Sequence, residues 1–417
     1  MLTKAPKGTK DMLPADAYKW QYIEKKFAEV CSRYDIKEIR TPMFEHTELF
    51  VRGVGDTTDI VQKEMYTWEQ SKRSLTLRPE GTSPVMRAFI ENKLYANPQP
   101  SKFYYNIPCF RYENPQAGRM RQFHQFGIEL FGSKSMMADT EVIVLAYDFL
   151  KELGIKDIAL EINSVGCPNC RKKHREALKE YLKPKYDQLC NTCKDRYERN
   201  PMRIIDCKNE TCKEIVKDAP TMIDYLCDDC KADFEALQEN LTAAGIEYTI
   251  NPDIVRGLDY YTKTAFEFVT NVIGAQGTVC GGGRYDHLGE ELGGPEIPGV
   301  GFGMGKERLL IVMEASGVVI PEEEPVDALI AFMGTEPKKA AIKLARELRN
   351  KGFKIEIDAM ERNFKGQFKL ADRTNARKTI VIGDNELEAK KVSIKTMATS
   401  TQEEVPFELD MIIEAIR

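Results

Sequence analysis

Polar and apolar positions alternate through residues 103–131 and predict an antiparallel hairpin with a turn at 114–118. Because successive side chains of a strand point to opposite faces, one face of the second strand suits a core, although Gln122 and His124 interrupt it. Its apolar members are Met120, Phe126, Ile128 and Leu130, and the polar members of the opposite face are Arg119, Arg121, Gln125 and Glu129. Arg111 and Glu113 share a face before the turn. A solvated charged face is the commoner outcome, but three arginines beside two acids and a glutamine favour an anion site.

Residues outside the hairpin predict a mixture of helices and strands. Apolar residues at helical spacing indicate helices over 16–34 and 137–153. Residues 36–45 predict a strand that leads into a turn at Thr41–Pro42, and residues 158–162 predict another strand. Residues 74–90 predict a strand, a turn and a helix that is capped by Thr82 or Ser83 and has Pro84 at its first position.

A change of texture marks an insertion. From 166 to 249 the chain is polar, cysteine-paired and mostly helical in pattern, which indicates an insertion domain within a larger domain spanning 1–325. The larger domain resumes at 253–270, where glycines at 281–283 predict a turn and glycines punctuate 299–305 before a helix at 306–314. Beyond an acidic, proline-containing linker at 320–326, strands and helices alternate. Residues 326–417 therefore predict a small α/β domain with a largely parallel sheet.

Composition narrows the class of protein. The chain has 417 residues, enough for two or three domains, with 42% apolar and 30% charged residues. The net charge of −5 excludes a uniformly basic nucleic-acid coat but not local basic patches. No apolar run approaches the ~18 residues of a membrane span, and the first residues lack a secretory apolar segment. We therefore expect a cytoplasmic protein with no membrane contact.

Eight of the eleven cysteines are paired within the insertion. They are Cys167, Cys170, Cys190, Cys193, Cys207, Cys212, Cys227 and Cys230. Free or redox-active thiols are the simpler interpretation of one C-x-x-C, but four close pairs in a reducing compartment favour structural zinc, two ions with four thiolates each. Which pairs share an ion, and whether a single ion with four spare thiols is bound instead, stays open at this point.

Several motifs resemble those of class II aminoacyl-tRNA synthetases. Phe110-Arg111-Tyr112-Glu113 is similar to the second signature motif, residues 301–310 with Arg308 to the third, and the segment around Thr41-Pro42 to the first, dimer-forming one. RPEGT (78–82), VRGLDYYT (255–262) and GTVCGGGRYDHL (277–288) narrow the resemblance to the histidyl-tRNA synthetase family over nearly the whole chain. The cysteine pairs and Asn114, in place of a basic residue, depart from the family pattern.

The resemblance implies an α+β catalytic domain with an antiparallel sheet, a helical insertion approaching the tRNA acceptor arm, and a C-terminal α/β domain that binds the anticodon. It implies a homodimer that uses ATP with Mg²⁺ to form histidyl-adenylate and then charges the tRNA for histidine. In the C-terminal domain, the spacing of Arg362, Lys365, Lys369, Arg373 and Arg377 predicts one basic helical stripe for RNA phosphates, or simply a solvated face.

Site roles follow from the same resemblance. Arg111 is implied at the α-phosphate, Glu113 near the adenine, and Arg119, Arg121 and Arg308 at the outer phosphates. Arg256 is implied as a cation facing both the reacting carboxylate and the α-phosphate, whereas a surface salt bridge is its simpler interpretation. The residues implied around histidine are Glu80, Thr82, Gln125, Glu129, Arg256, Tyr260 and Tyr261, although Tyr260 by itself fits a core aromatic pair better.

Two other functions are compatible with parts of the sequence. One is a regulatory paralogue that binds histidine without charging tRNA, which would lack ATP-contacting arginines or the C-terminal domain. The other is a zinc-bearing RNA-binding module, which would not need the histidine-pocket motifs.

Overall fold

The computed structural model describes residues 3–56, 58–273, 277–322 and 324–417, so part of the predicted linker, residue 323, lies outside the described residues. The chain divides into two compact units, Met1–Ile320 and Pro321–Arg417. Among the helices of the described ranges, none combines the length and apolar character that crossing a bilayer requires.

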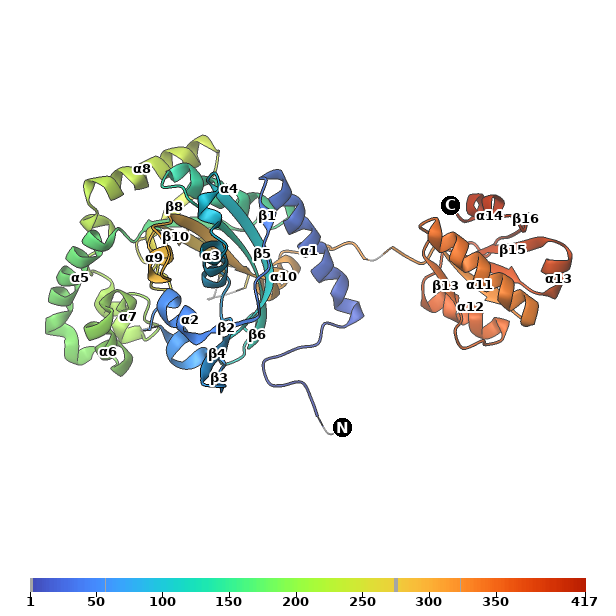
Figure 1. The fold of residues 1–417 in the computed structure, drawn as a ribbon, viewed down its shortest axis with the longest axis horizontal. Helices are drawn as coiled ribbons and strands as arrows, with labels where there is room; N and C mark the ends of the chain where they lie inside the picture. The colour runs from blue at the N-terminus through green and yellow to red at the C-terminus, as the bar shows by residue number, and fades with distance from the viewer. Residues whose placement is uncertain (1–2, 57, 274–276, 323) are drawn as a thin grey trace. The chain divides into compact units, whose positions relative to one another are not determined.

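An eight-stranded sheet forms the centre of the first unit (Figure 1). Its order is β1 (Lys37–Glu38), β5 (Ser101–Phe110), β6 (Gln122–Phe131), β11 (Gly299–Gly305), β10 (Thr278–Arg284), β9 (Thr262–Val269), β7 (Ala159–Ser164) and β8 (Tyr248–Ile250). The strands from β5 to β7 are antiparallel, and the short edge strands β1 and β8 pair in parallel. The implied antiparallel catalytic sheet is confirmed.

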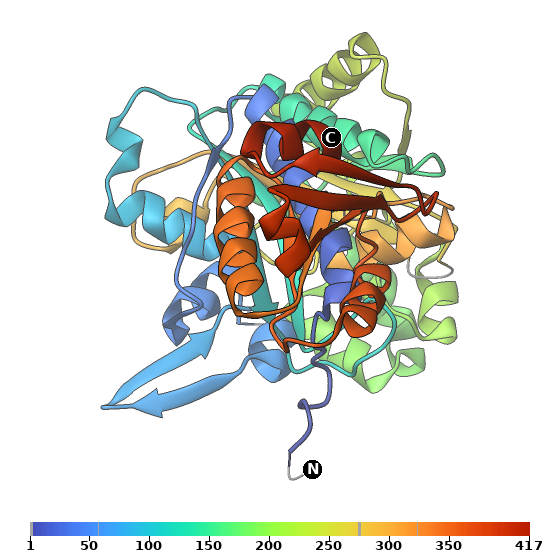
Figure 2. The same ribbon diagram turned by 90° about the vertical axis from the view of Figure 1, so that its right-hand side faces the viewer.

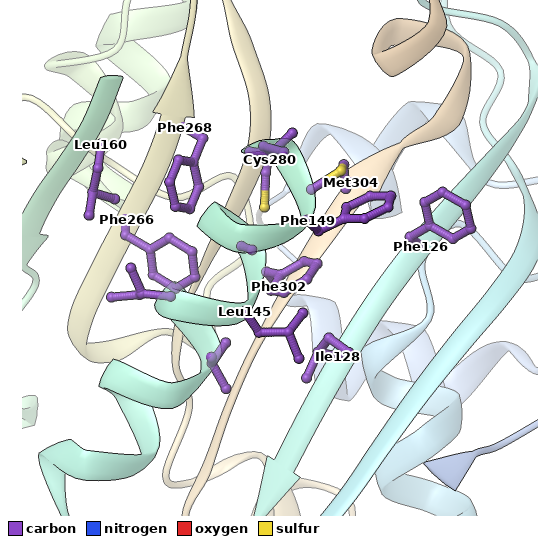
Figure 3. Packing of buried hydrophobic residues seen from close by; sticks show 14 of the residues in the cluster. Phe126, Ile128, Leu145, Phe149, Leu160, Phe266, Phe268, Cys280, Phe302 and Met304 are labelled. Carbon is purple, nitrogen blue, oxygen red and sulfur yellow. The ribbon is translucent and has the colours of Figure 1, made fainter. Parts of the chain in front are cut away.

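One face of this sheet is the apolar core. Helices α1 (Pro14–Arg33), α4 (Met136–Glu152), α8 (Asp228–Ala243) and α10 (Lys306–Ala315) cover it. Figure 3 shows Phe126 and Ile128 of β6 pointing to the same side as Phe302 of β11 and Leu145 of α4. The predicted apolar face is thereby confirmed for Phe126, Ile128 and Leu130, whereas Met120 lies before the strand and outside this core. The opposite face carries polar side chains beside a second apolar cluster, which includes Tyr105, Ile107 and Phe131.

The hairpin differs from its prediction at the tip. Strand β6 begins at Gln122, so Arg119 and Arg121 lie in the turn rather than on the strand. His124 lies on the core side as expected, with its Nδ1 3.0 Å from the Glu307 carboxylate and its ring 4.9 Å from that of Trp20.

The glycines at 281–283 do not make a turn. They lie within β10, and the glycine-punctuated segment 299–305 is its partner β11. Local rules favour a turn because glycine weakens a strand. Here the missing side chains leave room for those of other segments: Arg256 lies against Gly281, and Gln125 against Gly303.

A three-stranded sheet lies at the edge of the first unit, in the order β2 (Phe44–His46), β4 (Arg73–Leu77) and β3 (Thr67–Gln70). Figure 2 shows the β3–β4 hairpin projecting from it. The strand predicted from Ile36 into a turn at Thr41–Pro42 is β1, and after the turn the chain continues as β2 in a different sheet. Buried Arg78 stabilises the break by donating to the carbonyl oxygens of Thr41 and Pro42. Helix α2 (Thr47–Val54) follows β2.

The insertion is helical, as predicted. Its helices are α5 (Pro168–Leu182), α6 (Asn191–Arg199), α7 (Glu210–Val216) and α8. The chain enters from β7 and returns through β8, and β7 and β8 are paired in the main sheet.

The second unit has a mixed sheet rather than the predicted largely parallel one. Its order is β13 (Ile355–Ile357), β12 (Ala328–Phe332), β14 (Lys378–Ile382), β15 (Lys391–Thr396) and β16 (Gln402–Pro406). The first three are parallel and the last two antiparallel. Residues 383–390 are too few for the crossover of about a dozen residues that a parallel pair needs. Helices α11 (Thr335–Asn350), α12 (Phe364–Arg373), α13 (Asp384–Glu388) and α14 (Leu409–Ile416) complete the unit.

Candidate active site

A buried carboxylate lies at the centre of the polar face. Glu129 of β6 is fully buried and accepts hydrogen bonds from Thr82 Oγ1 at 2.7 Å, from the Tyr105 hydroxyl at 3.1 Å, and from the Tyr285 hydroxyl. Desolvation raises the pKa of Glu129 to about 8, although these three donors act in the opposite direction. Sequence reasoning assigned no role to Tyr105, and it noted Tyr285 only as part of a glycine motif.

Glu80 ends in the same buried region but is turned toward a helix. Its carboxylate accepts from the backbone N–H of Thr82 at 2.6 Å and of Ser83 at 3.0 Å, at the start of α3 (Thr82–Glu91). The helix therefore begins at Thr82 after Gly81, and Thr82 and Ser83 do not cap it as predicted. Pro84 is its third residue. A glutamate is suited to this place because free N–H groups gather at a helix N-terminus.

The segment before β9 supplies a cation and two rings. Arg256 Nη1 donates to Glu267 Oε1 at 2.5 Å, and its guanidinium lies 5.1 Å from the centre of the Tyr261 ring. The buried Nε of Arg256 has no hydrogen-bond partner among the described residues. Arg256 is thus largely buried on the polar face, not the surface salt bridge of the simpler interpretation. Tyr260 and Tyr261 are both buried, with ring centres 4.7 Å apart.

Gln125 lies on the same face as Glu129, next along β6. Its Oε1 is 3.7 Å from the Cys109 sulfur, and its amide covers Gly303 of β11. Gly301 is covered in the same way by the Glu129 carboxylate and the Tyr285 hydroxyl. Glycines of β10 and β11 therefore form the floor on which these polar side chains lie.

The predicted phosphate ligands surround this floor. Arg111 donates from Nε to Pro79 O at 2.9 Å and lies over the Phe123 ring. Arg119 is 3.7 Å from the Glu113 carboxylate, and Arg308 Nη1 donates to Thr278 O at 2.6 Å. Desolvation lowers the pKa of Arg308. The charge of Arg119 lowers it further, and the charge of Glu113 raises it. The structure thus brings these three charged residues together.

Arg121 and Arg284 have other partners. Arg121 stacks on the Tyr112 ring at 3.8 Å and donates to the Glu113 carbonyl oxygen at 3.3 Å. Arg284 is fully buried and forms an ion pair with Asp139 of α4, so it has a structural role.

A basic cavity of about 450 Å³ adjoins Arg256 and Tyr261. The insertion lines its other side with Arg171, Lys172, Arg175, Arg199 and Arg203. Asp259 also lines it and is 3.6 Å from Arg203. Sequence reasoning did not find this cavity, although Arg171, Lys172 and Arg175 are one helical turn apart or less. The excess of cations suits a polyanionic ligand.

The eight cysteines form two sets of four, and in each set the sulfurs lie within 4.8 Å of one another. The outer set is Cys167, Cys170, Cys227 and Cys230, and the inner set is Cys190, Cys193, Cys207 and Cys212. The pairing is nested: the first C-x-x-C of the insertion joins the last. Sequence spacing left this pairing open.

Within the sets, sulfur separations match one bound ion. They are 3.5 Å between Cys167 and Cys170, 4.0 Å between Cys167 and Cys227, and 3.9 Å between Cys190 and Cys207. A tetrahedral zinc ion with bonds of ~2.3 Å separates its sulfurs by ~3.8 Å. Disulfide sulfurs are much closer, and all eight cysteines are free.

In the second unit the predicted basic stripe is shorter. Lys365, Lys369 and Arg373 are exposed on α12. Arg362 precedes the helix and pairs with Asp358, and Arg377 follows it and pairs with Glu324 and Asp327. The helix ends after Arg373, so five cations at helical spacing do not share one helix.

Similarity to known proteins extends over nearly the whole chain. A family model described as histidyl-tRNA synthetase matches residues 8–309, and one described as an anticodon binding domain matches residues 319–416. The chain is 58% identical to "Histidine--tRNA ligase" of Caldanaerobacter subterraneus subsp. tengcongensis over all of both chains. It is 55% identical to the protein of that name from Clostridioides difficile, covering all of this chain and 99% of the other.

Solved structures give the same picture. The apo histidyl-tRNA synthetase of S. aureus is 42% identical with a TM-score of 0.84, and the match covers all of both chains. A Bacillus halodurans chain described as an ATP phosphoribosyltransferase regulatory subunit/histidyl-tRNA synthetase is 23% identical with a TM-score of 0.66, covering 92% of this chain and 99% of the other, and shares the fold.

Proposed function

The chain belongs to the histidyl-tRNA synthetase family, and on that premise we propose how its residues carry out the family's reaction. The chain attaches histidine to tRNA at the expense of ATP. One observation carries the assignment of the site: a buried carboxylate, Glu129, and a largely buried cation, Arg256, lie over glycines of the neighbouring strands β11 and β10.

Glu129 is the proposed reader of the histidine ring. Its carboxylate accepts a bond from one imidazole nitrogen, and Tyr261 meets the other. Tyr105 and Tyr285 hold the carboxylate in place through their hydroxyls. An apolar side chain in this pocket would leave Glu129 without that bond, and such mismatches cost a substrate about 10⁴-fold or more. Glu80, Thr82 and Gln125 are the proposed partners of the histidine ammonium and carboxylate, and Tyr260 packs behind Tyr261.

Adenylate formation needs charge stabilisation more than a base. A carboxylate oxygen of histidine forms a bond to the α-phosphorus of ATP, and the bond to the bridging oxygen breaks as diphosphate leaves. The attacking carboxylate is already ionised, so positioned cations dominate the rate. Arg256 and Arg111 are the proposed cations at the α-phosphate. Arg119, Arg121 and Arg308 are assigned to the outer phosphates and Glu113 to the adenine end.

We propose two kinds of metal. Mg²⁺ would accompany ATP, because phosphate oxygens are ligands that this ion prefers. Glu113 and Glu267, whose charges act on Arg308, are the carboxylates that would hold it. It would offset phosphate charge. Zinc is proposed in both cysteine sets, which offer four sulfurs at tetrahedral separations. Four thiolates leave no position for water, so zinc has a structural role.

The proposed tRNA contacts involve both units. The basic cavity beside Arg256 is suited to phosphates of the acceptor end, because its cations outnumber its carboxylates. The second unit is assigned to the anticodon, with Lys365, Lys369 and Arg373 of α12 available to phosphates. Since ATP and tRNA are present together in the cytoplasm, we place the reaction there.

A homodimer is proposed from the surface of the small sheet. Met43 and Phe44 are about half exposed, at 53% and 50%, and Phe44 packs on the partly exposed Trp68 with ring centres 5.9 Å apart. These residues lie directly after Thr41–Pro42, where the sequence resembles the dimer motif. Light scattering should give twice 47.5 kDa at micromolar concentration. A particle of monomer mass would exclude the dimer.

A regulatory paralogue without charging activity is not favoured, because Arg111, Arg121, Arg256 and Arg308 and the second unit are all present. Two assays on the full chain test the proposal. Histidine should support exchange of labelled diphosphate into ATP, and labelled histidine should become attached to tRNA. Exchange that is absent, or independent of histidine, would overturn the assigned function, and exchange without charging would indicate the paralogue.

A further inference from the structure

We propose that zinc in the outer cysteine set holds the histidine pocket in shape. This inference rests on the proposed function, because it assigns Tyr261 and Arg256 to that pocket. The outer zinc would be a positioning site: it touches no substrate and acts through the segment that carries both residues.

The outer set joins the two ends of the insertion. Cys167 directly precedes α5, and Cys227 directly precedes α8. The second cysteine of each pair lies in the first turn of its helix and is buried. The backbone N–H of Cys227 also donates to the Cys170 sulfur at 3.1 Å. One ion here fixes the start of α5 against the start of α8.

The first arm, from Val165 to the start of α5, is hydrogen-bonded to Lys263 of β9, the strand that follows Tyr261. Val165 N donates to Lys263 O at 2.7 Å, and Lys263 N donates to Gly166 O at 3.0 Å. Gly166 has φ of +63°, and a methyl group on it would lie 2.6 Å from the Cβ of Cys170. Gly166 therefore contacts Cys170 and bonds to Lys263, so a shift of the cysteine pair would move Lys263.

The second arm, the start of α8, also contacts Lys263. Asp233 lies on α8 about one turn after Cys230, and its carboxylate accepts from Lys263 Nζ at 2.8 Å. Lys263 has φ of +50°, a conformation that non-glycine residues adopt only when their surroundings impose it. Both arms of the insertion thus converge on Lys263, two residues after Tyr261, whose ring lies under Arg256.

Apolar packing gives the outer set little support of its own. Within the described part of the chain, the buried members of its cluster are Cys170, Met222 and Cys230. The inner set shares a larger cluster with Leu178, Leu182, Leu189, Ile204 and Ile215. A small polar module with little core depends on metal ligation for its folding energy. Loss of the outer zinc should therefore free the starts of α5 and α8, together with their contacts to Lys263. The inner set reaches a different part of the segment, where Arg203 donates to Gly257 O at 2.5 Å, and its larger apolar cluster remains packed without zinc.

Two matched substitutions test the difference, because Cys167 and Cys190 are both half-buried residues directly before a helix. Cys167→Ser and Cys190→Ser should each lose one of two zinc equivalents by elemental analysis. In histidine-dependent diphosphate exchange, Cys167→Ser should raise KM for histidine about tenfold or more, as expected for a misplaced binding group, with KM for ATP nearly unchanged. Cys190→Ser should raise KM for histidine much less, because the larger apolar cluster keeps Arg203 in place at Gly257.

Asp233→Asn provides a second test that leaves the thiolates intact. It should keep two zinc equivalents and still raise KM for histidine, and zinc returned to chelator-treated unaltered protein should restore that constant. An unchanged KM for histidine in Cys167→Ser and Asp233→Asn would overturn the inference, as would equal effects of Cys167→Ser and Cys190→Ser. If the unaltered protein shows no histidine-dependent exchange, the proposed function fails instead, so the two failures are distinguishable.

Discussion

Gly281→Ala should misplace the Arg256 guanidinium without unfolding the chain. Gly281 lies in β10 beneath Arg256, and a methyl group built on it would be 2.7 Å from both terminal nitrogens and 3.0 Å from Cζ. Ordinary contact begins at 3.4 Å, so the guanidinium must retreat by about 0.7 Å. The colliding atoms are the free end of a long side chain, so the backbone of β10 need not move.

The expected cost falls on the chemical step. A misplacement of about 1 Å in a reacting constellation costs on the order of 10²-fold in rate, so ~0.7 Å predicts a loss of about 10- to 100-fold. That corresponds to about 1.4–2.7 kcal/mol of transition-state stabilisation. Histidine-dependent diphosphate exchange measures it, with kcat falling more than either KM changes.

Gly257→Ala is the matched control. Gly257 follows Arg256 directly, its φ lies outside the left-handed region, and a methyl group on it would meet no described atom within 4 Å. This variant should exchange diphosphate at nearly the normal rate. If Gly281→Ala has a thermal midpoint like that of the unaltered protein and retains full exchange activity, the placement of Arg256 at the reacting phosphate is refuted.

Three further variants test the other proposed roles. Arg256→Ala should abolish histidine-dependent exchange in a folded chain, a loss of about 3–5 kcal/mol of transition-state stabilisation, and near-normal exchange would contradict it. Glu129→Gln should raise KM for histidine far more than KM for ATP. Because burial raises the pKa of Glu129 from 4.5 to about 8, the folded protein binds an extra proton between these values and loses stability as pH rises through them. The thermal midpoint of Glu129→Gln should therefore improve relative to the unaltered protein from pH 5 to pH 8, and a constant difference would argue against a protonated Glu129. Removing residues 326–417 should cripple tRNA charging yet spare exchange, and undiminished charging would disprove the anticodon role.

Local pattern was sufficient wherever a side chain's neighbours are near in sequence. Period-two alternation in residues 122–131 determined which face of β6 packs in the main apolar core, because a strand allows only two directions for its side chains. Helical spacing determined α1 and α4 to within about two residues. The cysteine spacings indicated metal because C-x-x-C places two sulfurs near one ion whatever the fold around it.

Tertiary structure decided every pairing between distant segments. The glycines of β10 signal a turn by themselves, and only the approach of Arg256 from another segment explains a strand there. The nested cysteine sets, the hydroxyls of Tyr105 and Tyr285 on Glu129, and the basic cavity all join residues far apart in sequence. Short-range periodicity does not encode the path of the chain between such residues, since that path is fixed by the packing of the whole unit.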